Sequence, residues 1–288
     1  MYGRLALVTA VLALAPQVRA GTAGTDRSTS PAAAQGSQTP APTPQAIAAE
    51  VTAAQTPAAR IAFAPGEQIE WNVEYLGVRT GTARLQVGRA EGDIWPVIAQ
   101  ARTEGIAKLL EIREHFVSYW DVPRQLPRGS HLEALEIGDY HVEKTRFDRD
   151  QGKVTVEWTR KGKLKSKQVE IPHDVHDFAS AILWLRLQPL AVGDVYDIPV
   201  FTGSHTFTMR AEVAGKESVK TQLGQHDTFR VDLQLGFKDE FKTSRPSRIW
   251  FTADFAKIPV KLAADFAVGS VVATLNSYAP GGDVAVRR

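Results

Sequence analysis

The fold of this chain is organised around the stretch HDVHDFASAILWLRLQPLAVGD, residues 173–194. It is the one helical pattern in a sequence that otherwise alternates between apolar and polar residues. Its apolar positions recur at the spacing of one helix face, with Trp184 beside them: Phe178, Ala181, Ile182 and Leu185. Asp174 or Asp177 can cap the first free amides, and Pro189 and Gly193 end the pattern. We therefore predict a single central α-helix.

On both sides of this stretch the sequence predicts strands. Residues 67–75 alternate strictly, with Ile69, Trp71 and Val73 on one face and polar residues between them. The same period recurs in about a dozen runs separated by short turns, and short turns join antiparallel neighbours. A sheet of that size must curl or close. We predict a mainly β fold: a strongly curved antiparallel sheet, or an open or closed β-barrel, with the helix on or inside it.

Residues 105–122 fit this scheme less clearly, because Ile112, Phe116 and Trp120 have helical spacing. The β-branched and aromatic residues that follow His115 favour a pleated surface over a helix. We expect a strand after His115.

The N-terminal region has the layout of a processing signal. Arg4 precedes an apolar run at residues 5–15, and Val18-Arg19-Ala20 offers small residues for cleavage after Ala20. We predict a signal peptide at 1–20, a disordered tether rich in Ala, Pro and Thr at 21–59, one β-rich domain at 60–280 and a tail at 281–288. The mature protein is expected to be secreted or periplasmic.

Composition excludes several classes of protein. The 288 residues carry a formal charge of +2, which is too small to indicate nucleic acid as a partner. There is no cysteine, which excludes disulfides, thiolate chemistry and a lipidated N-terminal cysteine. After the leader, no apolar run reaches the ~18 residues of a membrane-spanning helix.

Three motifs in order carry a resemblance to a known family: GEQIEWNVEY at 66–75, DFASAILWLR at 177–186, and WFTADFAKIPV at 250–260 with a closing Gly269. Each motif is short, but the three motifs in this order resemble an exported bacterial family catalogued as a domain of unknown function, number thirty-one-oh-eight. The resemblance implies a β-rich secreted or periplasmic domain. It implies no reaction or cofactor and transfers no catalytic residue.

A cluster of ionisable residues at the helix start has two interpretations. His173, Asp174, His176 and Asp177 could hold zinc or another divalent ion if residues three apart share a face of the first helical turn. Capping and solvent exposure explain the same cluster more simply, and no HExxH pattern is present. We assign no metal and no cofactor. Residues 148–152 resemble a calcium loop only faintly, and a hairpin turn is the simpler interpretation.

No motif of nucleophilic catalysis is present. Serine precedes histidine at Ser130-His131 and at Ser204-His205, but neighbours on a strand point to opposite faces, so we expect neither pair to react. The sequence has no GxSxG elbow and no phosphate-binding glycine loop. We therefore assign no catalytic residue.

Aromatic and charged residues of the predicted strands and helix are the candidates for ligand contact: Trp71, Tyr75, Asp177, Trp184, Arg186 and Trp250. Arg186 lies about 13 Å along a helix from Asp177, too far for a direct pair. We expect its guanidinium to bind a carboxylate or carbonyl oxygens on a neighbouring strand.

A basic segment follows the middle strands and includes a rim of four residues: Arg160, Lys161, Lys163 and Lys165. Lysines protect exposed edge strands from pairing with other chains. Alternatively, the rim holds anionic lipid headgroups or acidic glycans.

Two functional hypotheses of different classes follow. We favour a non-enzymatic envelope protein whose concave sheet binds a lipid, another hydrophobic ligand or a partner protein, because one helix cannot cover so long a sheet. The alternative is a hydrolase of an envelope polymer that uses His176 and Asp177. It would require those side chains to meet another acid in a cleft.

Overall fold

The computed structural model describes residues 61–236, 247–265 and 269–282. The predicted signal peptide, the predicted tether and residues 283–288 of the predicted tail lie outside the described residues. The domain boundaries therefore stay predictions.

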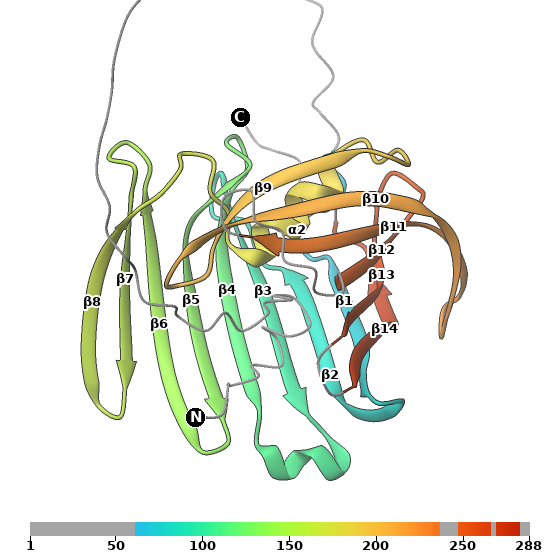
Figure 1. Cartoon of the computed structure of the whole chain (residues 1–288), viewed down its shortest axis with the longest axis horizontal. Coiled ribbons are helices and arrows are strands. Elements are labelled where there is room, and N and C mark those ends of the chain that lie inside the picture. The colour runs from blue at the N-terminus through green and yellow to red at the C-terminus, as the bar shows by residue number, and fades with distance from the viewer. Residues whose placement is uncertain (1–60, 237–246, 266–268, 283–288) are drawn as a thin grey trace, which may run out of the picture. The chain divides into compact units, whose positions relative to one another are not determined.

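Fourteen strands form one antiparallel sheet in this part of the chain (Figure 1). The first eight are β1 (Gln68–Tyr75), β2 (Val78–Val87), β3 (Ile94–Thr103), β4 (Arg113–Asp121), β5 (Leu126–Glu136), β6 (Asp139–Asp148), β7 (Lys153–Arg160) and β8 (Lys163–Glu170). The other six are β9 (Val195–Phe201), β10 (Thr206–Thr221), β11 (Gly224–Gly236), β12 (Ser247–Thr252), β13 (Pro259–Asp265) and β14 (Ser270–Ala279).

The sheet consists of two meanders joined at its centre. Strands β1 to β8 follow one another in order, and so do β9 to β14, while β1 pairs with β14. The two outermost strands, β8 and β9, do not pair with each other in the described residues. The prediction of a curved antiparallel sheet is confirmed. The prediction left undecided whether the sheet is open or closed into a barrel, and the structure shows that it is open.

The α-helix α2 (Phe178–Leu187) lies inside the curve of this sheet. It contacts β3, β4 and β5 in one meander and β9 in the other, so the sheet has to bend around it. Its burial is wider than the predicted stripe, because Ala179, Ser180 and Leu183 are also buried. A helix covered on most sides is expected to be apolar around its circumference.

The period-two pattern builds the face that receives α2. On β1 the alternating Ile69, Trp71 and Val73 are all fully buried, as predicted. Residues 105–122 divide into a 3-10 helix, η1 (Gly105–Leu110), and strand β4. The expected strand after His115 is confirmed, and it begins two residues earlier, at Arg113.

Arg186 of α2 forms the buried ion pair that ties the helix to the sheet. Its two terminal nitrogens donate to the two carboxylate oxygens of Glu67 at 2.7 Å each. The same guanidinium donates to the carbonyl oxygens of Ala62 and Ala256, at 3.2 and 2.9 Å. Tyr278 also donates to Glu67, and burial raises the pKa of its phenol to about 12. The expected partner types, a carboxylate and carbonyl oxygens, are present, but the expected location is wrong: Glu67 precedes β1, and Ala62 and Ala256 lie in loops rather than on a neighbouring strand.

Candidate functional site

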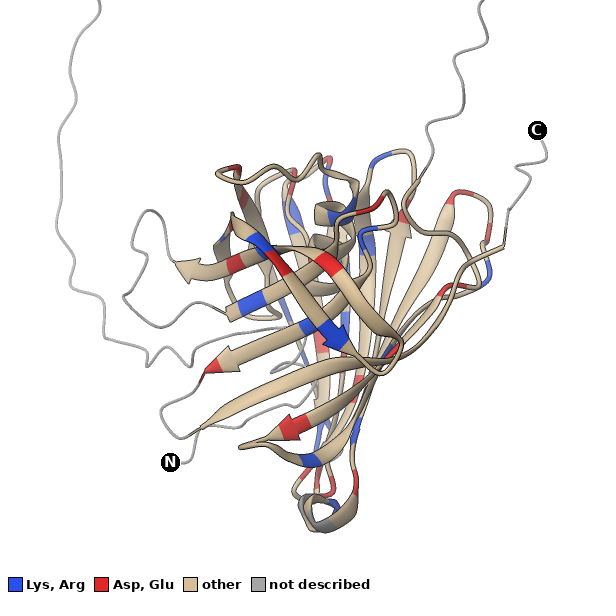
Figure 2. Cartoon of the chain, turned by 90° about the vertical axis from the view of Figure 1, so that its right-hand side faces the viewer, with Lys and Arg blue, Asp and Glu red and all other residues tan. Residues whose placement is uncertain are grey.

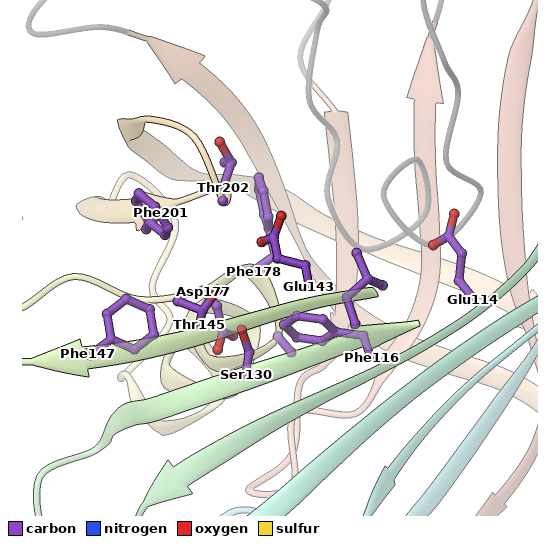
Figure 3. A pocket seen from close by; sticks show the side chains of 13 residues that line it. Glu114, Phe116, Ser130, Glu143, Thr145, Phe147, Asp177, Phe178, Phe201 and Thr202 are labelled. Atoms are coloured by element: carbon purple, nitrogen blue, oxygen red, sulfur yellow. The ribbon is translucent and has the colours of Figure 1, made fainter. Parts of the chain in front are cut away.

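A pocket of about 120 Å³ opens between the inner face of β4 to β6, the first turn of α2 and the end of β9 (Figure 3). Its apolar lining consists of four phenylalanines, a leucine and an alanine: Phe116, Phe147, Phe178, Phe201, Leu132 and Ala179. Three carboxyl groups border it, from Glu114, Glu143 and Asp177. Apolar walls with a few polar groups are typical of small-ligand sites.

Strand register brings these residues together. Phe116 on β4 lies opposite Leu132 on β5, and Leu132 lies opposite Glu143 on β6. Cross-strand partners point to the same face of a sheet, so all three side chains face α2. The strand alternation therefore places a glutamate at a position that burial would normally assign to an apolar residue.

Burial governs the acidity of the pocket. The pKa of Glu143 is raised above its usual value because burial disfavours the charged form, with Lys167 and a hydrogen bond from Thr145 opposing the shift. Burial also raises the pKa of Asp177, against hydrogen bonds from Ser118 and Ser180. A pocket with such groups accommodates an uncharged ligand surface more readily than an anion.

Asp177 is the N-cap of α2. Its Oδ1 accepts from the backbone N–H of Ser180 at 2.8 Å, and the Ser180 hydroxyl bonds back to the Asp177 backbone N–H at 3.0 Å. Its Oδ2 accepts from the hydroxyl of Ser118 on β4 at 2.6 Å. Of the two predicted caps, Asp177 is confirmed. Asp174 lies outside the helix and is exposed.

Replacing this cap should destabilise the protein. We expect Asp177→Ala to lower the free energy of unfolding by about 1–3 kcal/mol, since it removes the cap and leaves the Ser118 hydroxyl without its acceptor. Asp177→Ser should lose less, because serine also caps. Urea unfolding of both variants measures the difference, and equal losses would show that capping is not the cause.

His176 is buried in an aromatic environment beside the pocket. Its ring stacks on Trp120 with centroids 6.3 Å apart, and Trp184 lies 6.0 Å away. Burial, with a smaller contribution from Arg149, lowers its pKa to about 3. Its backbone pairs with β9, donating to Pro199 O and accepting from Phe201 N–H at 2.8 Å each. His176 therefore covers part of an edge strand.

The metal hypothesis for this cluster assumed a helical first turn, and the structure corrects that assumption. Residues 173–176 precede α2, and His173 is exposed whereas His176 is buried. The described residues contain no group of three or more His, Cys, Asp or Glu that could hold a metal. The helix begins only after its Asp177 cap, so the two histidines share no helix face.

A second correction concerns Ser204 and His205. The two residues precede β10 rather than lying on a strand, so the alternation of side chains along a strand does not apply to them. The Ser204 hydroxyl and His205 Nδ1 are 2.9 Å apart. Both residues are exposed at the surface.

A larger groove of about 410 Å³ continues from the pocket along β5 to β7. It shares Leu132 and Glu143 with the pocket and adds Trp158 and Lys167. The Lys167 ammonium lies over the Trp158 ring, 5.8 Å from its centroid, and donates to the Ser204 carbonyl at 3.4 Å. The β9–β10 loop thus reaches over the strands of the first meander.

Glycine is required where this loop meets β6. Gly203 has a φ of 77°, and a side chain there would collide with the carboxyl group of Glu143.

The structure does not bring the predicted ligand residues together, and their role in binding stays a prediction. Of the six, Asp177 lines the pocket. Trp71 is fully buried and donates its indole N–H to Pro259 O at 2.7 Å, while Trp250 donates to Glu217 at 2.7 Å. Trp184 and Tyr75 are half-buried against the main core. Arg186 is bound to Glu67.

The phenylalanines were missed because the candidates were chosen by residue type rather than by strand register. Phe116 and Phe147 lie at inward positions of β4 and β6, and that parity was readable in the sequence. The contributions of Phe178 and Phe201 were not readable, because they depend on where α2 and β9 lie over the sheet.

The basic rim lies along the β7–β8 hairpin. Arg160 pairs with Asp139, whereas Lys161, Lys163 and Lys165 are exposed on or beside the edge strand β8. This position agrees with edge protection. Elsewhere, basic and acidic residues are interspersed along the strands (Figure 2).

Comparisons with known proteins identify a family and a fold. The family "Protein of unknown function (DUF3108)" matches residues 69–276. A β-barrel-like protein of the domain of unknown function DUF1849 from Brucella abortus aligns with a TM-score of 0.53 at 11% identity, covering 76% of this chain and 99% of that chain. A Bacteroides fragilis protein with a YmcC-like fold covers 76% and 98% at 11% identity, with a TM-score of 0.29.

No curated protein matches the sequence. The likeness to the Brucella protein concerns the fold alone, and neither its description nor that of the family indicates an enzymatic activity. Within residues 61–236, 247–265 and 269–282, no helix has the length and apolar character that a bilayer crossing requires.

Proposed function

The chain belongs to the DUF3108 family of proteins of unknown function, and from that premise we propose that it is a non-enzymatic protein of the cell envelope that binds an apolar ligand group. The binding site is the pocket between β4 to β6 and α2. The ligand is a lipid, another hydrophobic molecule or an apolar group of a partner protein. Export follows from the predicted leader.

The observation that carries this proposal is the aromatic lining of the pocket. An apolar cavity of about 150 Å³ lined by Leu, Ile and Phe holds benzene. The pocket, at about 120 Å³, therefore has room for the end of an acyl chain or for one ring. The rest of a longer ligand would lie in the adjoining groove, where Trp158 and Leu132 offer apolar surface.

The hydrolase alternative has less support. A general base has to exchange a proton near the working pH, and the pKa of His176 is lowered to about 3. Asp177 is engaged by Ser118 and by the helix amides. Both side chains thus have structural partners that account for their burial.

Obstructing the pocket should abolish ligand retention. We expect Leu132→Trp to lower the fraction of ligand-bound protein about tenfold, because the indole would occupy space that the ligand needs. Native mass spectrometry of protein purified from the cell envelope measures that fraction.

A matched control lies on the same strand. Leu135→Trp makes the same change on the opposite face of β5, and it should retain the ligand as the wild type does. Wild-type protein without any bound mass, or equal retention in both variants, would contradict the proposal.

A further inference from the structure

The first meander has two chemically different ends. Its β1–β2, β3–β4, β5–β6 and β7–β8 connections all lie at one end, because consecutive strands are antiparallel (Figure 1). This end carries large exposed apolar side chains, here called the tip row: Leu76 (60% exposed), Val78 (59%), Leu109 (87%), Ile137 (76%), Tyr140 (54%) and Leu164 (69%).

The opposite end of the same meander provides an internal comparison. Its three connections, at 88–93, 122–125 and 149–152, contribute no large exposed apolar side chain among the described residues. They carry exposed polar groups instead, such as Glu91, Arg124 and Gln151. The apolar character is therefore a property of one end and not of the hairpins in general.

Backbone conformation at the tips argues against a folding role for these side chains. Leu76 and Ile137 are in the left-handed region, with φ of 52° and 51°, each followed by glycine in a two-residue turn. Asn, Asp and Gly are favoured at this position, and a β-branched residue there is an outlier. Leu76 lies partly against Gly269, but it is still 60% exposed and Ile137 is 76% exposed, so the fold gains little burial from them in return.

The tip row carries an unbalanced positive charge at one of its ends. Arg79 and Arg160 pair with Glu104 and Asp139, so those parts of the row are near balance. The β7–β8 connection instead presents exposed lysines at 161 and 163 beside Leu164. The row is thus apolar along its length and cationic at one corner, a combination that fits an anionic bilayer surface.

We propose that the tip row docks the protein on an anionic lipid bilayer, with the apolar tips inserted among the headgroups. Neighbouring strands are about 5 Å apart, so the four hairpin tips are separated by about 10 Å and do not merge into one apolar patch. A fluid bilayer accepts separate apolar points, whereas a protein partner requires a continuous complementary surface. This surface is distinct from the pocket, and its test does not depend on the ligand there.

The test is vesicle flotation of the exported protein, recovered from the periplasm, with Leu76→Asn/Ile137→Asn as the variant. The vesicles contain phosphatidylglycerol and phosphatidylethanolamine, or phosphatidylcholine alone. We expect the double variant to bind anionic vesicles at least ~10-fold more weakly. Its thermal midpoint should stay the same or rise, because asparagine tolerates the left-handed conformation. A loss of binding therefore cannot be ascribed to unfolding.

Two further variants complete the experiment. Leu223→Asn removes a leucine that is 50% exposed in the β10–β11 turn, outside the tip row, and should bind as the wild type does. Lys161→Glu/Lys163→Glu should weaken binding to anionic vesicles alone. Wild-type protein that stays free of all vesicles, or unchanged binding of the tip variant, overturns the proposal. A dimeric wild type together with a monomeric tip variant also overturns the proposal, since the tip row would then be a protein interface.

Discussion

Arg186→Met is expected to lower the free energy of unfolding by about 3–5 kcal/mol, the largest loss we predict for a single side chain. The guanidinium is fully buried and is the counter-ion of Glu67, whose side chain is 2% exposed. Without it, a carboxylate is left in the core and the carbonyls of Ala62 and Ala256 lose a donor. Equilibrium unfolding in urea measures the loss.

The double variant Glu67→Leu/Arg186→Met distinguishes the loss of the ion pair from the cost of leaving one charge buried without a partner. Removing both charges leaves no uncompensated ion, so its destabilisation should be smaller than the sum of the two single losses. Arg186→Lys should not rescue, because an ammonium cannot donate to both oxygens in the parallel geometry of a guanidinium. A loss below about 1 kcal/mol in Arg186→Met would contradict this account of how α2 is held.

Acidification is expected to destabilise the protein through His176, by about 4 kcal/mol between pH 6.5 and pH 3. The imidazole has a pKa of 6.5 in the unfolded chain and about 3 in the fold, where it is buried between tryptophans. In that interval the unfolded state binds the proton and the folded state does not. The contribution of His176 is therefore complete above pH 6.5 and is lost as the pH falls toward 3.

His176→Gln provides the control, since glutamine can hydrogen-bond to Ser180 but does not titrate. Asp177 and Glu143 have the opposite sign, because a raised carboxyl pKa favours the folded state at low pH and that gain is lost as the pH rises. Both groups are retained in the variant, so subtracting its unfolding curves from those of the wild type isolates His176. If the free energy of unfolding had the same pH dependence in the wild type and in His176→Gln, the acid destabilisation would not come from His176.

Short-range pattern accounts for most of the fold. The α2 helix and the strand after His115 were readable from a few neighbouring residues, and so was Asp177 as one of two candidate caps; the structure confirms the helix and the strand and selects Asp177. The wrong expectation for Ser204 and His205 also came from a short-range rule. The alternation rule was applied to residues that precede a strand, where it does not hold.

The partner of Arg186 shows where such reasoning ends. Its distance from Asp177 along the helix predicted a carboxylate or carbonyl partner elsewhere in the chain, and the structure supplies both kinds. Glu67, however, lies 119 positions away in the sequence. Nothing local distinguishes it from the other glutamates of the alternating strands, because the pair forms only when α2 lies against the start of β1.

The sequence by itself determined the strand period and the position of the helix, because each depends on contacts within a few residues. Only the tertiary structure decided that the sheet is open and that Phe116, Phe178 and Phe201 meet Glu143 around one pocket. Those outcomes depend on the bend accumulated over fourteen strands, which sets where α2 and β9 lie above the inner face.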